Sequence, residues 1–131
     1  NGILNLFGNS IQFQELNGAS NGNLINVEIS MNFVIYISDN IGAITPVTSL
    51  DFIAQQIIFT GTSTSVITTT SQCYTTTTSM QVDETTFQAL GSSIIFLCDI
   101  TGTSLYVQGD SSIDNVYSIF TDSIDYLSGI H

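Results

Sequence analysis

The chain of 131 residues contains neither lysine nor arginine, and this absence restricts its partners more than any other feature. Its 11 acidic residues and one histidine leave a formal net charge of −11 at pH 7. Nucleic acid and anionic lipid both require cationic side chains that neutralise phosphates. We therefore expect no nucleic-acid partner. A network of salt bridges cannot form either.

Charged residues of any kind are scarce: they make up 8% of the chain, against about 25% in typical soluble domains. Serine, threonine, asparagine and glutamine supply the polar surface instead, and their hydrogen bonding does not depend on pH. At about pH 2–3 most carboxylates are protonated, so the chain would approach neutrality. The composition favours an extracellular protein, and an acidic habitat is the sharper interpretation.

Long hydrophobic runs are also missing, since no segment reaches the roughly 18 apolar residues that cross a bilayer. We expect no membrane insertion. The first residue is Asn1 rather than Met, which predicts that a leader peptide has been removed. Cys73 and Cys98 are the two cysteines, and an extracellular setting predicts a disulfide between them, which would contribute roughly 3 kcal/mol.

No motif for catalysis, metal binding or cofactor binding is present. His131 is the last residue, where chains usually fray, so it is a poor catalytic base. The Asp-Thr-Gly or Asp-Ser-Gly loop of aspartic proteases is absent. Asp110, Asp114, Asp122 and Asp125 lack the spacing of a calcium-binding loop and are predicted to be solvated acids. We expect a protein that is not an enzyme and has no metal or cofactor.

Alternation of apolar and polar residues predicts β-strands. The strongest example is 24–37, in which every odd position is apolar, Phe33 included. Residues 49–59 fit a strand better than a helix, and Asp83 to Gly91 fit a short helix with Asp83 as its cap. Seven or eight short strands without a repeated βα unit indicate an all-β fold, a single β-sandwich that is Ig-like or jelly-roll-like. Further strands are expected at 93–100, 104–108, 115–121 and 124–127.

The N-terminal segment 1–16 is apolar and prone to form a strand, and the Asn- and Gly-rich segment 17–23 reads as a flexible linker to a head domain at 24–131. Residues 11–16 could pair with 24–37 as a hairpin. Alternatively, segment 1–16 could protrude and complete the sheet of a neighbouring subunit. The side chains that would fill the neighbour's groove are Ile3, Leu4, Leu6, Phe7, Ile11 and Phe13.

The runs ILNLF and IQFQEL before NGASNGN, together with the Thr-rich body and the missing cations, resemble the archaeal extracellular filament subunits that assemble by donor-strand exchange, such as the thread filaments of acid-loving thermophiles. The resemblance implies a cell-surface homopolymer for adhesion, cell–cell contact or biofilm. It also implies a glycoprotein. No Asn-x-Ser/Thr acceptor exists here, but the 14 Ser or Thr residues within 60–79 could carry an O-linked surface glycan.

Two other classes of protein fit the same pattern. The main alternative is a viral coat or virion surface protein with a β-sandwich and an N-terminal arm. The other is a monomeric binding module or acid hydrolase. Deleting residues 1–16 should leave soluble, unstable monomers if the strand is donated, and should barely change oligomer size if the strand pairs within its own molecule. A coat protein should instead give closed shells or nucleic acid in purified particles, and a hydrolase should show an activity that one Asp→Asn change abolishes.

Overall fold

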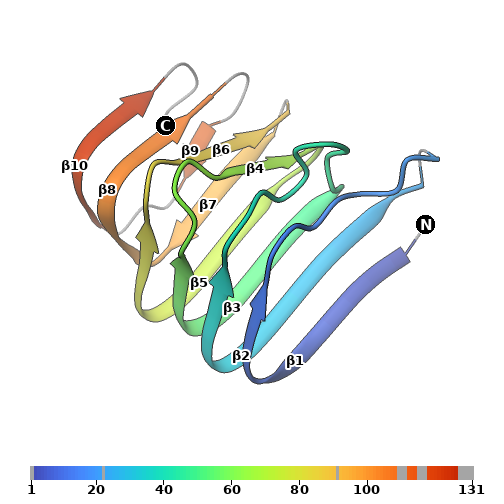
Figure 1. Cartoon of the computed structure of the whole chain (residues 1–131), viewed down its shortest axis with the longest axis horizontal. Helices are drawn as coiled ribbons and strands as arrows, with labels where there is room; N and C mark the ends of the chain where they lie inside the picture. Colours follow the sequence, from blue (N-terminus) through green and yellow to red (C-terminus); the bar gives the residue numbers. More distant parts are fainter. Residues whose placement is uncertain (1, 22, 91, 109–111, 115–117, 127–131) are drawn as a thin grey trace.

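All strand pairs in the described part of the chain are parallel, and the chain winds into a β-solenoid of about five turns. The computed structural model describes residues 2–21, 23–90, 92–108, 112–114 and 118–126. The coils follow one another along a single axis from β1 to β10 (Figure 1). The strands are β1 (Gly2–Phe13), β2 (Ile25–Ile37), β3 (Ser49–Phe59), β4 (Ser65–Thr68), β5 (Gln72–Val82), β6 (Thr85–Ala89), β7 (Ser93–Leu97), β8 (Asp99–Val107), β9 (Ser112–Asp114) and β10 (Ser118–Tyr126).

The expected β-sandwich with a protruding donor strand is therefore wrong. Segment 1–16 does not leave the molecule, because β1 pairs in parallel with β2 from Gly2↔Ile25 to Phe13↔Ile37. The hairpin alternative is wrong as well, since a hairpin would make this pair antiparallel. A parallel pair needs a connection that returns to the starting end, and the residues between β1 and β2 are long enough to do this.

Each coil has three sides. The long strands bend at a corner where the pairing slips by a residue, for example between Gly8 and Ser10 in β1, and so each forms two sides (Figure 1). The third side consists of β4, β6, parts of β8 and β10 and two earlier connecting segments. On this side one column of paired residues runs through every coil, namely Leu16, Ile41, Val66, Phe87, Val107 and Tyr126.

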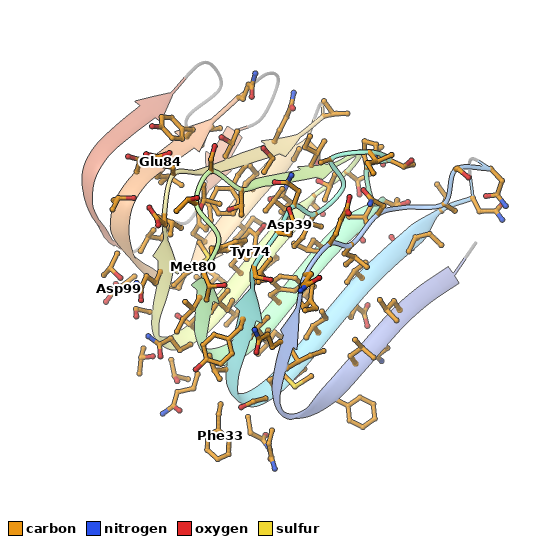
Figure 2. All side chains as sticks on the ribbon, viewed as in Figure 1. Phe33, Asp39, Tyr74, Met80, Glu84 and Asp99 are labelled. Carbon is orange, nitrogen blue, oxygen red and sulfur yellow. The ribbon has the colours of Figure 1, made fainter. Side chains whose placement is uncertain are left out.

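The core is built from columns of side chains that repeat once a coil. Phe52, Tyr74 and Phe96 occupy one such column and are each fully buried. The Tyr74 and Phe96 rings stack with centroids 5.4 Å apart, and the Phe52 ring meets Tyr74 edge-on at 5.9 Å. Figure 2 shows Tyr74 and Met80 in the interior. Stacked and edge-on aromatic pairs add stability beyond the area they bury, so this column helps to fix the register between coils.

Several local predictions can now be judged. The strands expected at 24–37 and 49–59 are confirmed as β2 and β3. The helix expected over 83–91 is wrong: Glu84 takes a φ of 50° in a turn, and Thr85–Ala89 forms β6. The Thr-rich stretch 60–79 runs into β5, which lies between β3 and β8 with its residue Tyr74 in the core.

Residues 17–23, expected to be a flexible linker, include a tightly packed position. The Gly18 amide donates to the Thr45 carbonyl at 2.8 Å, and a Cβ at Gly18 would collide with the Pro46 carbonyl oxygen. The Asn17 Oδ1 accepts from the Ile44 amide at 3.1 Å. Asn17 and Gly18 therefore pack against the second coil, whereas Ser20, Asn21 and Asn23 are exposed.

The coils shorten along the chain. Paired positions are 23 residues apart between β1 and β2, as in Leu4↔Val27. The spacing is 22 for Leu50↔Gln72, 20 for Met80↔Ile100 and 19 for Asp99↔Ser118. The perimeter of the solenoid is therefore larger at the β1 end than at the β10 end.

Replacement of Gly102 by alanine should weaken the solenoid severely. Gly102 has a φ of 137°, and a Cβ there would collide with the backbone of Val82 in the adjacent coil. We expect Gly102→Ala to lower the free energy of unfolding by at least about 2 kcal/mol in urea titrations. Gly2→Ala is the control, because a Cβ at Gly2 meets open space. Equal stability of the two variants would contradict the assigned backbone.

Candidate functional site

The six residues predicted to fill a neighbour's groove all lie on β1, but they divide between two faces. Leu4, Leu6, Ile11 and Phe13 turn inward and pack against the core of their own chain. Ile3 and Phe7 turn outward and are 64% and 79% exposed. The apolar alternation of β1 was therefore identified correctly, whereas the core that receives its inward side chains belongs to the same molecule.

The β1 end of the core is uncovered among the described residues. β1 lies at one end of the strand order, and its only partner strand among the described residues is β2. Its inward side chains are half-buried, whereas their column partners in β2 are completely buried: Leu6 pairs with Ile29, and Ile11 pairs with Ile35. Solenoid proteins normally need a polar cap over such an end. Here the end presents aliphatic and aromatic groups.

The open edge of β1 can be assigned residue by residue. The Gly2 amide donates to the Leu24 carbonyl at 2.8 Å, so Gly2 directs its backbone polar groups towards β2. Directions alternate along a strand, which turns the N–H and C=O groups of Ile3, Asn5 and Phe7 away from β2. Among the described residues no strand pairs with these groups, so they form an edge of the kind that recruits a further strand.

Two acids are stacked on the outer face of the solenoid. Glu28 of β2 pairs with Asp51 of β3, so the side chains project from neighbouring strands on the same face. Partial burial raises the pKa of Asp51 above its usual value of 3.8, and the negative charge of Glu28 raises it further. No lysine or arginine exists in the chain to offset this repulsion.

The predicted disulfide is wrong, because Cys73 and Cys98 are both free thiols. Cys73 lies in the outward column with Asp51 and Ile95, whereas Cys98 is buried in the core. The two side chains thus occupy opposite faces of the wall, which a disulfide cannot bridge without moving the backbone. Burial, followed by the nearby Asp51, raises the pKa of Cys73, and burial raises the pKa of Cys98 to about 12.

A shallow hollow of about 370 Å³ opens on the outer corner between β2, β3 and β5. The register explains it: between Ser30↔Ile53 and Val34↔Gln56, β2 has three residues and β3 has two. On the other side β3 again has one residue fewer than β5. The corner of β3 is therefore set back between two longer corners. The lining residues are Ser30, Met31, Asn32, Phe33, Ile53, Ala54, Gln55 and Thr77.

The most polar buried side chain serves the fold and is fully paired. The Gln72 Nε2 donates to the Gln88 carbonyl at 2.9 Å and to the Val66 carbonyl at 3.2 Å. Its Oε1 accepts the Tyr74 hydroxyl at 2.8 Å, and burial holds the pKa of Tyr74 well above its usual value. Gln72 thus joins the third side of the coil to the first.

Other chemistry is not assembled within the described ranges. They contain no group of three or more His, Cys, Asp or Glu side chains that could hold a metal ion. They also contain no helix long and apolar enough to cross a membrane. His131 and Asp110 lie outside the described residues, and so do the side chains of Asp114, Asp122 and Asp125.

Comparisons with protein-family models, with curated proteins and with solved structures gave no match. The function is therefore inferred from the geometry of this chain alone.

The stacked acids predict that stability falls as the pH rises. The folded state holds the Asp51 proton more tightly than the unfolded state does, so the Asp51 contribution is complete below pH 3.8 and is lost as the pH passes the raised pKa. We expect the thermal midpoint to be higher at pH 3 than at pH 7. Asp51→Asn should add up to about 1 kcal/mol at pH 7, because like charges directly opposite are destabilising.

Glu28→Gln provides the matched comparison. If the two acids repel each other, each single variant relieves the same repulsion and the double variant gains less than the sum. Additive effects, or a midpoint that rises between pH 3 and pH 7 in a manner abolished by Asp51→Asn, would contradict the assigned pairing.

The thiols give an independent check on the fold. In native protein at pH 8, iodoacetamide should label Cys73 slowly and leave Cys98 unmodified, because Cys98 is buried with a pKa of about 12. After denaturation without reductant, mass spectrometry should find both residues alkylated. If neither cysteine reacted until a reductant was added, the two residues would be joined by a disulfide and the assignment of free thiols would be wrong.

Proposed function

We propose that this chain is a structural subunit of an extracellular filament that grows by stacking solenoid ends, and that the filament serves adhesion, cell–cell contact or biofilm. The observation that carries the proposal is the open end at β1, where a backbone edge and a half-buried apolar surface coincide. An edge strand of this kind is a hazard unless another chain covers it.

The chemistry of β1 fits a second copy of the same chain. The strand GILNLFGNSIQF has no acidic residue, although the whole chain carries a net charge of −11. Two copies can therefore meet at this end without placing an acid of β1 against the partner. β1 also lacks the lysine, proline or inward charge that usually protects an edge strand from such contacts.

The orientation of the strands favours a head-to-tail contact. Within the described residues β10 pairs only with β8, so the last coil offers the second edge. Adding β1 of one copy beside β10 of the next would continue the parallel sheet. A contact between two different surfaces that does not close on itself produces a filament. This mechanism replaces the donated strand, because β1 already belongs to its own sheet.

The absence of cationic side chains leaves the acids without counter-charge, and this makes assembly depend on pH. At about pH 3 most carboxylates are protonated, which removes the repulsion between copies that a charge of −11 causes at neutral pH. This supports an acidic extracellular medium as the working environment. The coat-protein alternative depended on a β-sandwich and a free N-terminal arm, and the fold described above has neither.

A proline at Asn5 should prevent assembly and leave the fold intact. The Asn5 amide points to the open edge, so Asn5→Pro removes a donor that β2 does not use. We expect Asn5→Pro to remain monomeric at pH 3 in sedimentation velocity while wild type forms fibres visible in electron micrographs. Leu6→Pro is the matched control: its amide faces β2, so it should lower the thermal midpoint markedly.

Three results would contradict the proposal. Wild type that stays monomeric from pH 7 to pH 3 has no such contact. Growth that stops at a closed dimer indicates a symmetric pairing of two β1 edges. Fibres formed equally well by Asn5→Pro place the contact elsewhere on the molecule.

A further inference from the structure

Phe33 lies at the outer corner between β2, β3 and β5, and its ring is not part of the core. Phe33 is 55% exposed, and its ring projects away from the ribbon at the corner (Figure 2). It lies in the bulged part of β2, where Asn32 and Phe33 both face outward before Ile35 returns to the core. An exposed aromatic ring at the rim of a hollow offers a flat apolar face on which a ligand can pack.

Neutral hydrogen-bonding groups surround this ring. The Asn32 Nδ2 donates to the Asn9 Oδ1 at 2.9 Å, which orients the Asn32 amide and leaves its Oδ1 as an acceptor. The Thr78 hydroxyl donates to the Gln55 backbone carbonyl at 2.6 Å and so joins β5 to β3 beside the hollow. The Gln55 side-chain amide and the Thr77 hydroxyl bond to no other described residue, so both can bond to a ligand.

The charge and size of the hollow restrict the ligand class. None of the lining residues is ionisable, and the chain has no lysine or arginine, so phosphate, sulfate and uronic acid groups have no counter-charge. An aromatic face suits the apolar C–H face of a pyranose ring, and amides and hydroxyls suit its equatorial hydroxyls. The volume of about 370 Å³ is within the range of small-ligand pockets.

From these features we infer that the corner hollow binds a segment of neutral oligosaccharide. One sugar ring stacks on Phe33, and the amides of Asn32 and Gln55 and the hydroxyl of Thr77 bond to its hydroxyl groups. The lining residues all come from β2, β3 and β5 of one chain, and none of them belongs to β1, so a single subunit is sufficient for binding. The inference is therefore independent of the proposed filament.

The test uses monomeric protein at pH 7 and isothermal titration with hexasaccharides of β-1,4-glucose, β-1,4-N-acetylglucosamine and α-1,6-mannose, with oligogalacturonate as the anionic probe. We expect at least one neutral hexasaccharide to bind and oligogalacturonate to give no heat. Phe33→Ala should weaken binding by about tenfold, and Phe33→Trp should retain or strengthen it. Gln55→Ala should weaken binding as well.

Ile44→Ala is the control for removing an exposed apolar side chain, since Ile44 is 77% exposed and does not line the hollow. Its affinity should equal that of wild type, and the thermal midpoints of all variants should agree because every altered side chain is exposed. No binding of any neutral hexasaccharide at about 10 mM, equal affinity in Phe33→Ala and wild type, or a preference for oligogalacturonate would each overturn the inference.

Discussion

The rest of this structure depends on one constraint: each side chain must pack against the side chain at the paired position in the next coil. Adjacent parallel strands lie about 4.8 Å apart, so each residue stacks directly on its counterpart in the next coil. Aromatic rings meet this condition well, as Phe52, Tyr74 and Phe96 show in the core. Acids meet it poorly, which is why Glu28 and Asp51 interact unfavourably on the outside.

A polar residue in an inward column must find partners within its own plane, and Gln72 illustrates how. It occupies the column of Leu50 and Ile94, both apolar and buried. Its amide instead bonds across the coil to carbonyl groups of the third side. The triangular cross-section thus allows a substitution that a flat sheet could not accommodate, because the opposite wall is close enough to supply the missing hydrogen bonds.

Much of the strand content could be predicted from alternation, but the arrangement of the strands could not. The strands over 25–37 and 49–59 are present as expected, because burial on one face imposes period two in any sheet. That period does not specify whether the next strand returns antiparallel or parallel. The coil repeat carries this information, and it is hidden because one column contains Leu4, Leu50 and Gln72 at spacings that change from 23 to 22.

The corners were the least predictable part. Alternation places Phe33 in the core, yet it lies on a bend where successive side chains turn outward, and the chain there contains no glycine or proline to mark the bend. The free thiols follow the same logic. Cys73 and Cys98 were paired on the basis of environment, whereas the wall between the two faces of the solenoid separates them.

The shortening of the coils from 23 to 19 residues gives the molecule a taper, and the taper has a mechanical consequence. In the proposed filament, the wide β1 end of one subunit would meet the narrow β10 end of the next, and only part of the coil perimeter could be hydrogen-bonded across the contact. The joint is then weaker than any section within a subunit. Under tension, such a filament would separate between subunits before any subunit unfolded. The separated pieces would keep ends that can associate again.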